Sequence, residues 1–102
     1  MITIVATLQA APGKEAELRA VLTEMVNNVK QSEAGKVTAY SLHVSDSDPA
    51  TFLFYEQYAS DEALKEHGAT PHMGAMNQKI REGQLLAGRP TIARYTQIAG
   101  VS

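Results

Sequence analysis

The sequence predicts an α+β protein built in the order strand, helix, strand, strand, helix, strand. Two observations predict it: β-branched and aromatic residues dominate four short segments, and apolar residues recur at helical spacing in the regions between them. In this order the right-handed connection rule favours the ferredoxin-like βαββαβ arrangement, an antiparallel four-stranded sheet with helices on one face. The 102 residues fit one domain, 1–102, without linker or repeat.

The spacing of apolar residues changes twice in the first half of the chain. Residues 2–9 are rich in β-branched side chains and end at an Ala-Pro-Gly turn, so they predict a strand. Residues 14–31 then place apolar side chains on one helical face. These side chains are Leu18, Val21, Leu22, Met25, Val26 and Val29. Residues 36–44 predict a second strand, which an Asp-Ser-Asp-Pro turn ends.

The second half begins with the strongest strand signal, TFLFYEQY at residues 51–58. Residues 60–67 predict a short helix with a serine N-cap and acidic residues in its first turn. A glycine breaks this helix, and a Thr-Pro pair restarts a helix over residues 70–83. Residues 91–98 predict the last strand.

The third predicted strand is apolar on both faces. Phe52 and Phe54 point one way, whereas Leu53 and Tyr55 point the other way. Helices on one face leave the second face uncovered, and an uncovered apolar face is typical of an interface. We therefore expect a homodimer in which two-fold symmetry brings the same face of another copy onto it. The alternative is a second face that is only mildly apolar and is tolerated in water.

Composition argues against several classes of partner and cofactor. Nine basic and eleven acidic residues are mixed along the chain, so we expect no nucleic-acid partner. No apolar run approaches the roughly 20 residues of a membrane helix, and residues 2–9 do not resemble a signal peptide, so we expect a cytoplasmic protein without a membrane partner. Cysteine is absent, and no carboxylate completes a metal-ligand set with His67 and His72, which lie on either side of a helix break. We therefore expect no bound metal.

A set of motifs in fixed order carries a family resemblance. The motifs are APGKE after the first strand, EAGKVTAY, TFLFYEQY followed by ASDEALKEH, and ATPHM. Together they resemble the antibiotic biosynthesis monooxygenase family, which includes quinol monooxygenases, over nearly the whole chain. The resemblance implies a dimeric α+β barrel with a pocket between sheet and helices in each subunit. It also implies oxidation of a small phenolic or quinol-type aromatic substrate by O2 without any cofactor.

Such chemistry requires a group that takes a proton from the substrate in a dry pocket. His67 is the leading candidate base because imidazole titrates near neutrality, and an exposed histidine capping its helix is the alternative. Glu56 interrupts an apolar strand, where a carboxylate is costly to bury unpaired. It is therefore either a pocket group or the partner of a group across the dimer. Tyr58 could orient a substrate oxygen, although plain core packing is the commoner role of a buried tyrosine.

Five further residues are candidate substrate contacts. Tyr40 could donate a hydrogen bond to a substrate oxygen. Met73 and Met76 would form adaptable walls, although methionines at helical spacing more often belong to the core. Phe54 and Leu64 complete the expected lining of the pocket.

The resemblance leaves other functions open. Relatives that degrade haem carry a tryptophan near the place of Tyr58 and an asparagine near that of Ala6, and this chain has no tryptophan. An isomerase of a small phosphorylated signalling sugar is one alternative, because enolisation also needs one base. Scattered cations for its phosphate are Lys36, Lys65, Lys79 and Arg81. A non-catalytic dimeric barrel that binds an apolar ligand is the other alternative.

Overall fold

Four strands and three helices form in the computed structural model, which describes residues 1–101. The strands are β1 (Ile2–Gln9), β2 (Val37–Val44), β3 (Thr51–Tyr58) and β4 (Thr91–Thr96). The helices are α1 (Glu15–Ser32), α2 (Asp61–Gly68) and α3 (Pro71–Gly83). The predicted order is confirmed, with the second helical region divided into α2 and α3. Within residues 1–101, no helix combines the length and apolar character needed to cross a membrane.

The predicted bounds differ from the observed ones by one or two residues. Lys14 is the N-cap of α1 and lies outside the helix. Gly68 is the last residue of α2, so the helix runs one residue further than predicted. The last strand ends at Thr96 instead of residue 98. Its partner β1 begins at Ile2, which is paired with Thr96, so the chain beyond that point has no strand beside it.

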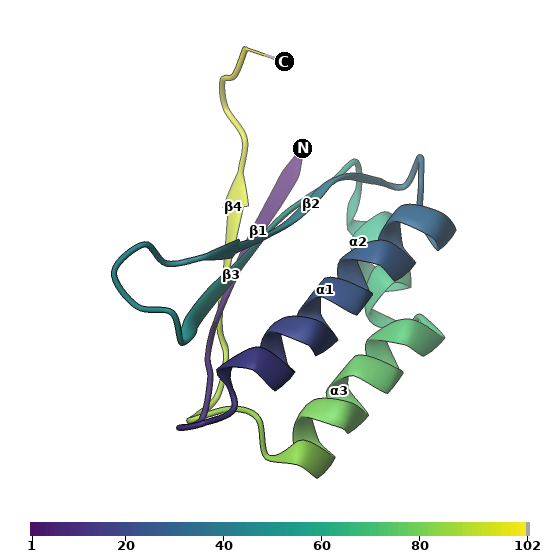
Figure 1. The fold of residues 1–102 in the computed structure, drawn as a ribbon. Helices are drawn as coiled ribbons and strands as arrows, with labels where there is room; N and C mark the ends of the chain where they lie inside the picture. Colours follow the sequence, from purple (N-terminus) through teal and green to yellow (C-terminus); the bar gives the residue numbers. More distant parts are fainter. Residues whose placement is uncertain (102) are drawn as a thin grey trace.

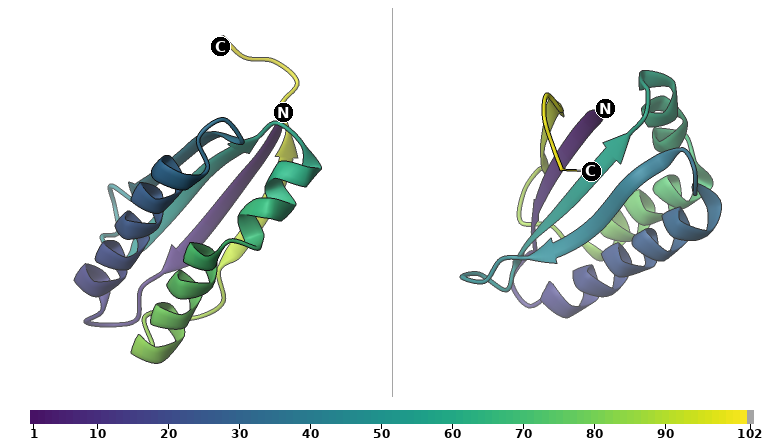
Figure 2. Two further views of the ribbon diagram at one scale, coloured as in Figure 1. Left: turned by 90° about the vertical axis from the view of Figure 1, so that its right-hand side faces the viewer. Right: turned by 90° about the horizontal axis from the view of Figure 1, so that it is seen from above.

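The sheet has the strand order β2-β3-β1-β4, and every neighbouring pair is antiparallel. Figures 1 and 2 show all three helices on the same face of this sheet, with α1 and α3 side by side. The ferredoxin-like prediction is therefore confirmed. Because β1 and β3 are the central strands, side chains on their helix-facing side have neighbours on every side.

The main core lies between α1, α3 and the middle of the sheet. Leu18, Leu22 and Met25 of α1 are almost completely buried. They share one cluster with Phe52 and Phe54 of β3, as strand parity predicts. Each fully buried side chain of this size stabilises the fold by about 1.5–3 kcal/mol relative to its exposed state.

A second, smaller core lies under α2. It contains Ile2, Ile4, Tyr58 and Ala63, with Leu64 packed beside it. This cluster fixes α2 over the ends of β1 and β3 where the candidate site residues lie.

Two hydroxyl side chains cap the helices next to this core. The Ser60 Oγ accepts a hydrogen bond from the Ala63 N–H at 3.1 Å. The Thr70 Oγ1 accepts from the Met73 N–H at 3.3 Å and donates to the His67 carbonyl at 2.9 Å. Both caps were predicted from sequence. Thr70 additionally connects the end of α2 to the start of α3.

The face of the sheet opposite the helices mixes apolar and polar side chains. Val5 and Leu53 are half-buried there, while Tyr55 and Tyr95 are 37% and 57% exposed. Threonine, serine and glutamine side chains lie between them. The predicted alternation along β3 is confirmed, and this open face is less uniformly apolar than β3 alone suggests.

Candidate active site

His67 lies inside the protein, between the end of α2 and the sheet. Its position four residues after Ala63 places both side chains on the sheet-facing side of α2. The residue is 4% exposed, so the alternative of a solvent-exposed histidine is wrong. Its ring packs against Tyr40 and Tyr58, with centroid distances of 5.2 and 5.4 Å.

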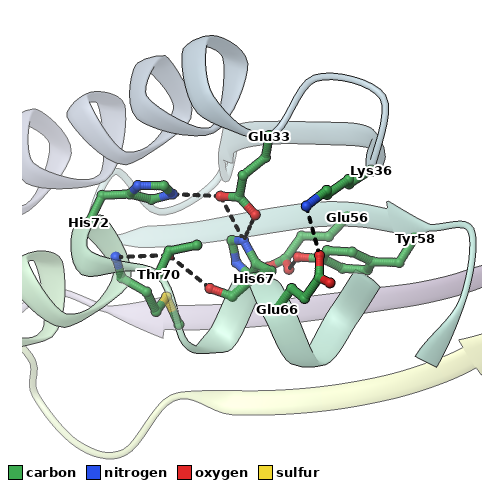
Figure 3. A network of polar contacts seen from close by, with 9 residues as sticks. Glu33, Lys36, Glu56, Tyr58, Glu66, His67, Thr70 and His72 are labelled. Carbon is green, nitrogen blue, oxygen red and sulfur yellow. Dashed lines mark hydrogen bonds and ion pairs between the residues drawn. The ribbon is translucent and has the colours of Figure 1, made fainter. Parts of the chain in front are cut away.

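A buried carboxylate, Glu33, joins His67 to a second histidine. The Nδ1 of His67 lies 3.0 Å from Oε1 of Glu33, and the Nε2 of His72 lies 2.5 Å from Oε2 (Figure 3). A carboxylate only accepts hydrogen bonds, so both imidazole nitrogens donate. The sequence pattern did not identify this carboxylate as a hydrogen-bond partner of the two histidines. Glu33 is 34 and 39 residues away from them in sequence, and its side chain reaches them only after α1 packs on the sheet.

The sequence does contain one signal for Glu33. The residue caps the C-terminus of α1, where the helix dipole disfavours a negative charge. A lone acidic side chain at such a place needs donors from elsewhere in the fold, and Figure 3 shows the two imidazoles that provide them.

Glu56 and Tyr58 form a second buried pair on the helix-facing side of β3. The Tyr58 hydroxyl donates to Oε1 of Glu56 at 2.5 Å. This contact satisfies the carboxylate within its own chain, so a partner across a dimer is not needed. Burial raises the pKa of Glu56, while the Tyr58 hydrogen bond and the nearby His67 oppose the rise. Burial also raises the pKa of Tyr58, and the Glu56 charge adds to that rise.

Tyr40 lies directly across from Glu56 in the neighbouring strand β2. Its ring packs on Phe54, with a centroid distance of 5.1 Å, as well as on His67. Burial, followed by the charges of Glu56 and Glu33, raises the pKa of Tyr40. Both tyrosines next to His67 are therefore neutral hydroxyls at physiological pH, able to donate a hydrogen bond to an anion.

Two openings lie between α1 and β2, at the edge of the sheet. One has a volume of about 360 Å³ and includes Val26, Leu42 and Phe52 in its walls. The other has a volume of about 320 Å³ and includes Val26 and Val37. Tyr40 lines both openings, and His67 lines neither. The expected enclosed pocket beside His67 is thus occupied by tyrosine rings, and Tyr40 stands between the imidazole and the openings.

The other candidate substrate contacts are core residues or half-buried residues packed against a core. Phe54 and Met76 belong to the main core, and Met73 packs beside it. Leu64 packs against the smaller core under α2. Their role as substrate contacts stays a prediction.

Two of the lysines considered for a phosphate site already have acidic partners. Lys36 pairs with Glu66 at 3.0 Å, and Lys79 pairs with Glu24 at 2.9 Å, both on the surface. In the part of the chain that the structure describes, no group of three histidine, aspartate or glutamate side chains has a geometry suited to a metal ion.

Comparison with known proteins shows the family to which the chain belongs. Residues 1–79 match the family model described as antibiotic biosynthesis monooxygenase. The chain belongs to the antibiotic biosynthesis monooxygenase family. The matched segment includes every residue of the two buried polar groups, which are Glu33, Glu56, Tyr58, His67 and His72.

Solved structures of similar proteins cover nearly the whole chain. PA3566 from Pseudomonas aeruginosa is 30% identical, with a TM-score of 0.85 over 96% of this chain and 94% of that one. A Caulobacter crescentus protein, provisionally described as an antibiotic biosynthesis monooxygenase, is 34% identical, with a TM-score of 0.86 over 96% and 90%. Rv0793 from Mycobacterium tuberculosis, 23% identical, shares the fold with a TM-score of 0.87 over 99% and 98%. A search of curated proteins finds no match.

Proposed function

We propose that this member of the family is a cofactor-independent monooxygenase that oxidises a small phenolic or quinol-type substrate with O2. One observation carries the proposal: a buried histidine, His67, is held by a carboxylate and packs against the rings of two neutral tyrosines. This arrangement supplies an oriented proton acceptor in an interior from which water is largely excluded.

The proposed reaction balances without an external reductant. His67 takes the phenolic proton of a hydroquinone, and the phenolate passes an electron to O2. The two radicals combine in a new ring C–O bond, and the proton held by His67 completes a ring hydroperoxide. The O–O bond then breaks. The outer OH of the hydroperoxide takes the hydrogen of that ring carbon and leaves as water, and the inner oxygen stays on the ring as a carbonyl. Hydroquinone and O2 thus give hydroxyquinone and water, and the substrate supplies all four electrons.

In this proposal the substrate enters at the edge of the sheet between α1 and β2. Tyr40 lines both openings there and packs on His67. A flat phenolic ring takes the place of the Tyr40 ring against the imidazole when Tyr40 turns toward the openings. The Tyr58 ring stays against the imidazole, with its hydroxyl still donating to Glu56, and the protonated imidazole faces the phenolate oxygen.

The proposal includes a homodimer formed through the open face of the sheet. Supporting it are the half-buried Leu53 and the partly exposed Tyr55 and Tyr95, which share this face. Pairing two such faces removes aromatic surface from water, which favours association.

Oxygen insertion tests the proposed function. The purified protein is incubated with a panel of hydroquinones under ¹⁸O2, and the products are analysed by mass spectrometry. We expect one ¹⁸O atom in the hydroxyquinone and the other in water. Autoxidation without the enzyme gives the quinone and hydrogen peroxide, and no oxygen enters the ring. A reaction with heat-denatured protein measures this background. Failure to insert oxygen into any hydroquinone would refute the assignment.

The role of His67 is tested by His67→Ala. Loss of the base should lower kcat for an accepted hydroquinone by a factor on the order of 10²–10⁴. A matched control is Glu62→Ala, which truncates an exposed side chain on the same helix and should retain activity. Circular dichroism checks that both variants fold. Unchanged turnover in His67→Ala would move the base elsewhere, with Glu56 the next candidate.

A further inference from the structure

We propose that Glu33 is the positioning residue of the base: its carboxylate fixes the tautomer and orientation of His67 so that Nε2 is presented to the substrate. The inference rests on the proposed function for its catalytic meaning, whereas its structural content can be measured without substrate.

The first step is the contact between the two side chains. Nδ1 of His67 lies 3.0 Å from Oε1 and 3.2 Å from Oε2 of Glu33. Glu33 is 6% exposed, so water competes little with this contact. A carboxylate accepts the Nδ1–H and leaves Nε2 as the ring atom with a free lone pair. Nε2 is therefore the atom that takes the substrate proton.

The second step is the fixing of Glu33 itself. The second histidine, His72, donates from Nε2 to Oε2, so the carboxylate has a donor at each oxygen. The backbone of Glu33 is held as well. Its N–H donates to the Val29 carbonyl at 2.9 Å, and its carbonyl accepts from the Val37 N–H at 3.1 Å. The orientation of the His67 ring is thus set by groups from the ends of all three helices.

The third step concerns energetics. A buried carboxylate loses hydration that its hydrogen bonds offset only in part. At the C-terminus of α1 the helix dipole adds a further unfavourable contribution. A side chain chosen for stability alone would be neutral here, and departures of this kind are expected at functional sites. The positioning of a base explains why an acid occupies the place.

The test compares Glu33→Gln with Glu33→Asp and with a control, Glu66→Gln. Glu66 precedes His67 on the same helix, is exposed, and pairs with Lys36 instead of the imidazole. The first readout is the tautomer of His67 in substrate-free protein, from ring ¹⁵N chemical shifts assigned by their absence in His67→Ala. We expect an Nδ1–H tautomer in the wild-type protein and in Glu66→Gln, and a mixture of tautomers in Glu33→Gln.

The second readout is turnover of an accepted hydroquinone. Glu33→Gln should lower kcat by about 10–100-fold with little change in KM, because Glu33 does not touch the substrate. Glu33→Asp should recover part of the loss, and Glu66→Gln should lose nothing. A wild-type His67 protonated on Nε2 would overturn the proposal, as would Glu33→Gln with wild-type tautomer and kcat. The two readouts can also separate. If the His67 tautomer depends on Glu33 but the protein oxidises no hydroquinone, the positioning role is supported and the monooxygenase assignment is refuted.

Discussion

Two carboxylates are buried within residues 1–101, and each has different donors. Glu33 accepts from two imidazoles, whereas Glu56 accepts from one tyrosine hydroxyl. No fully buried side-chain nitrogen or oxygen lacks a partner within residues 1–101. The two buried carboxylates beside His67 are therefore hydrogen-bonded while Nε2 of the imidazole stays open, which gives a base fixed surroundings and makes the charge state of its neighbours important.

At the scale of single residues, the raised pKa of Glu56 predicts how the free energy of unfolding depends on pH. The folded state binds the Glu56 proton more tightly than the unfolded chain, whose value is near 4.5. The contribution of Glu56 to stability is therefore fully present below that value and is lost as pH rises through the folded-state pKa. The Glu56→Gln variant has no carboxyl group at this position, so it does not lose this stability as pH rises.

The measurement is urea denaturation of the wild-type protein and Glu56→Gln at about pH 4 and about pH 7, at equal protein concentration. The wild-type unfolding free energy should fall relative to the variant between the two conditions. Titrating groups that do not interact with Glu56 contribute equally to both proteins and cancel in the difference. A difference that does not change with pH would contradict the prediction.

At the scale of elements, the junction between α2 and α3 determines where His67 lies. Thr70 caps α3, and its hydroxyl donates to the His67 carbonyl near the end of α2. The junction therefore couples the start of one helix to the position of the imidazole on the other. Ser60, at the far end of α2, caps that helix without contacting His67.

Thr70→Ala should lower stability by about 1 kcal/mol, the usual cost of losing an N-cap. Because the variant also removes the hydroxyl that donates to the His67 carbonyl, kcat for an accepted hydroquinone should fall. Ser60→Ala is the matched control: a similar loss of stability should leave kcat near the wild-type value. Urea denaturation and oxygen uptake measure the two quantities. Equal effects of both variants on kcat would show that the junction does not position the base.

At the scale of the whole molecule, the helices cover one face of the sheet and leave the other open (Figure 2). The chain beyond β4 continues away from the helices and carries the exposed Ile98 and Val101 (Figure 1). This segment borders a hollow of about 540 Å³ over the open face, whose walls include Tyr55 and Tyr95. An apolar segment beside aromatic side chains offers a second copy a continuous surface.

The homodimer prediction is tested by light scattering at micromolar concentration. The wild-type protein should have twice the 11.0 kDa mass of the chain. Leu53→Asp places a charge in the middle of the open face and should give a single-chain mass. Ile92→Asp changes an exposed apolar residue of β4 whose side chain lies on the helix-facing side of the sheet. This variant should stay dimeric. A monomeric wild-type protein would contradict the prediction.

The sequence by itself determined the order of the elements, their faces and two helix caps. Period-two alternation in residues 51–58 was enough to place Phe54, Glu56 and Tyr58 on one side of a strand. The caps at Ser60 and Thr70 were readable because an N-cap acts on backbone only two or three residues away. Such features depend on short stretches of chain, so local pattern is sufficient to predict them.

Only the tertiary structure decided what surrounds His67. The contact with Glu33 depends on where α1 ends relative to α2 and α3, and no local periodicity encodes that distance. The same holds for Tyr40, whose place between the imidazole and the edge openings follows from the packing of α1 over β2. Side chains far apart in sequence meet only when the helices pack onto the sheet, because burial of apolar surface is non-directional and the register of that packing is set by the whole core.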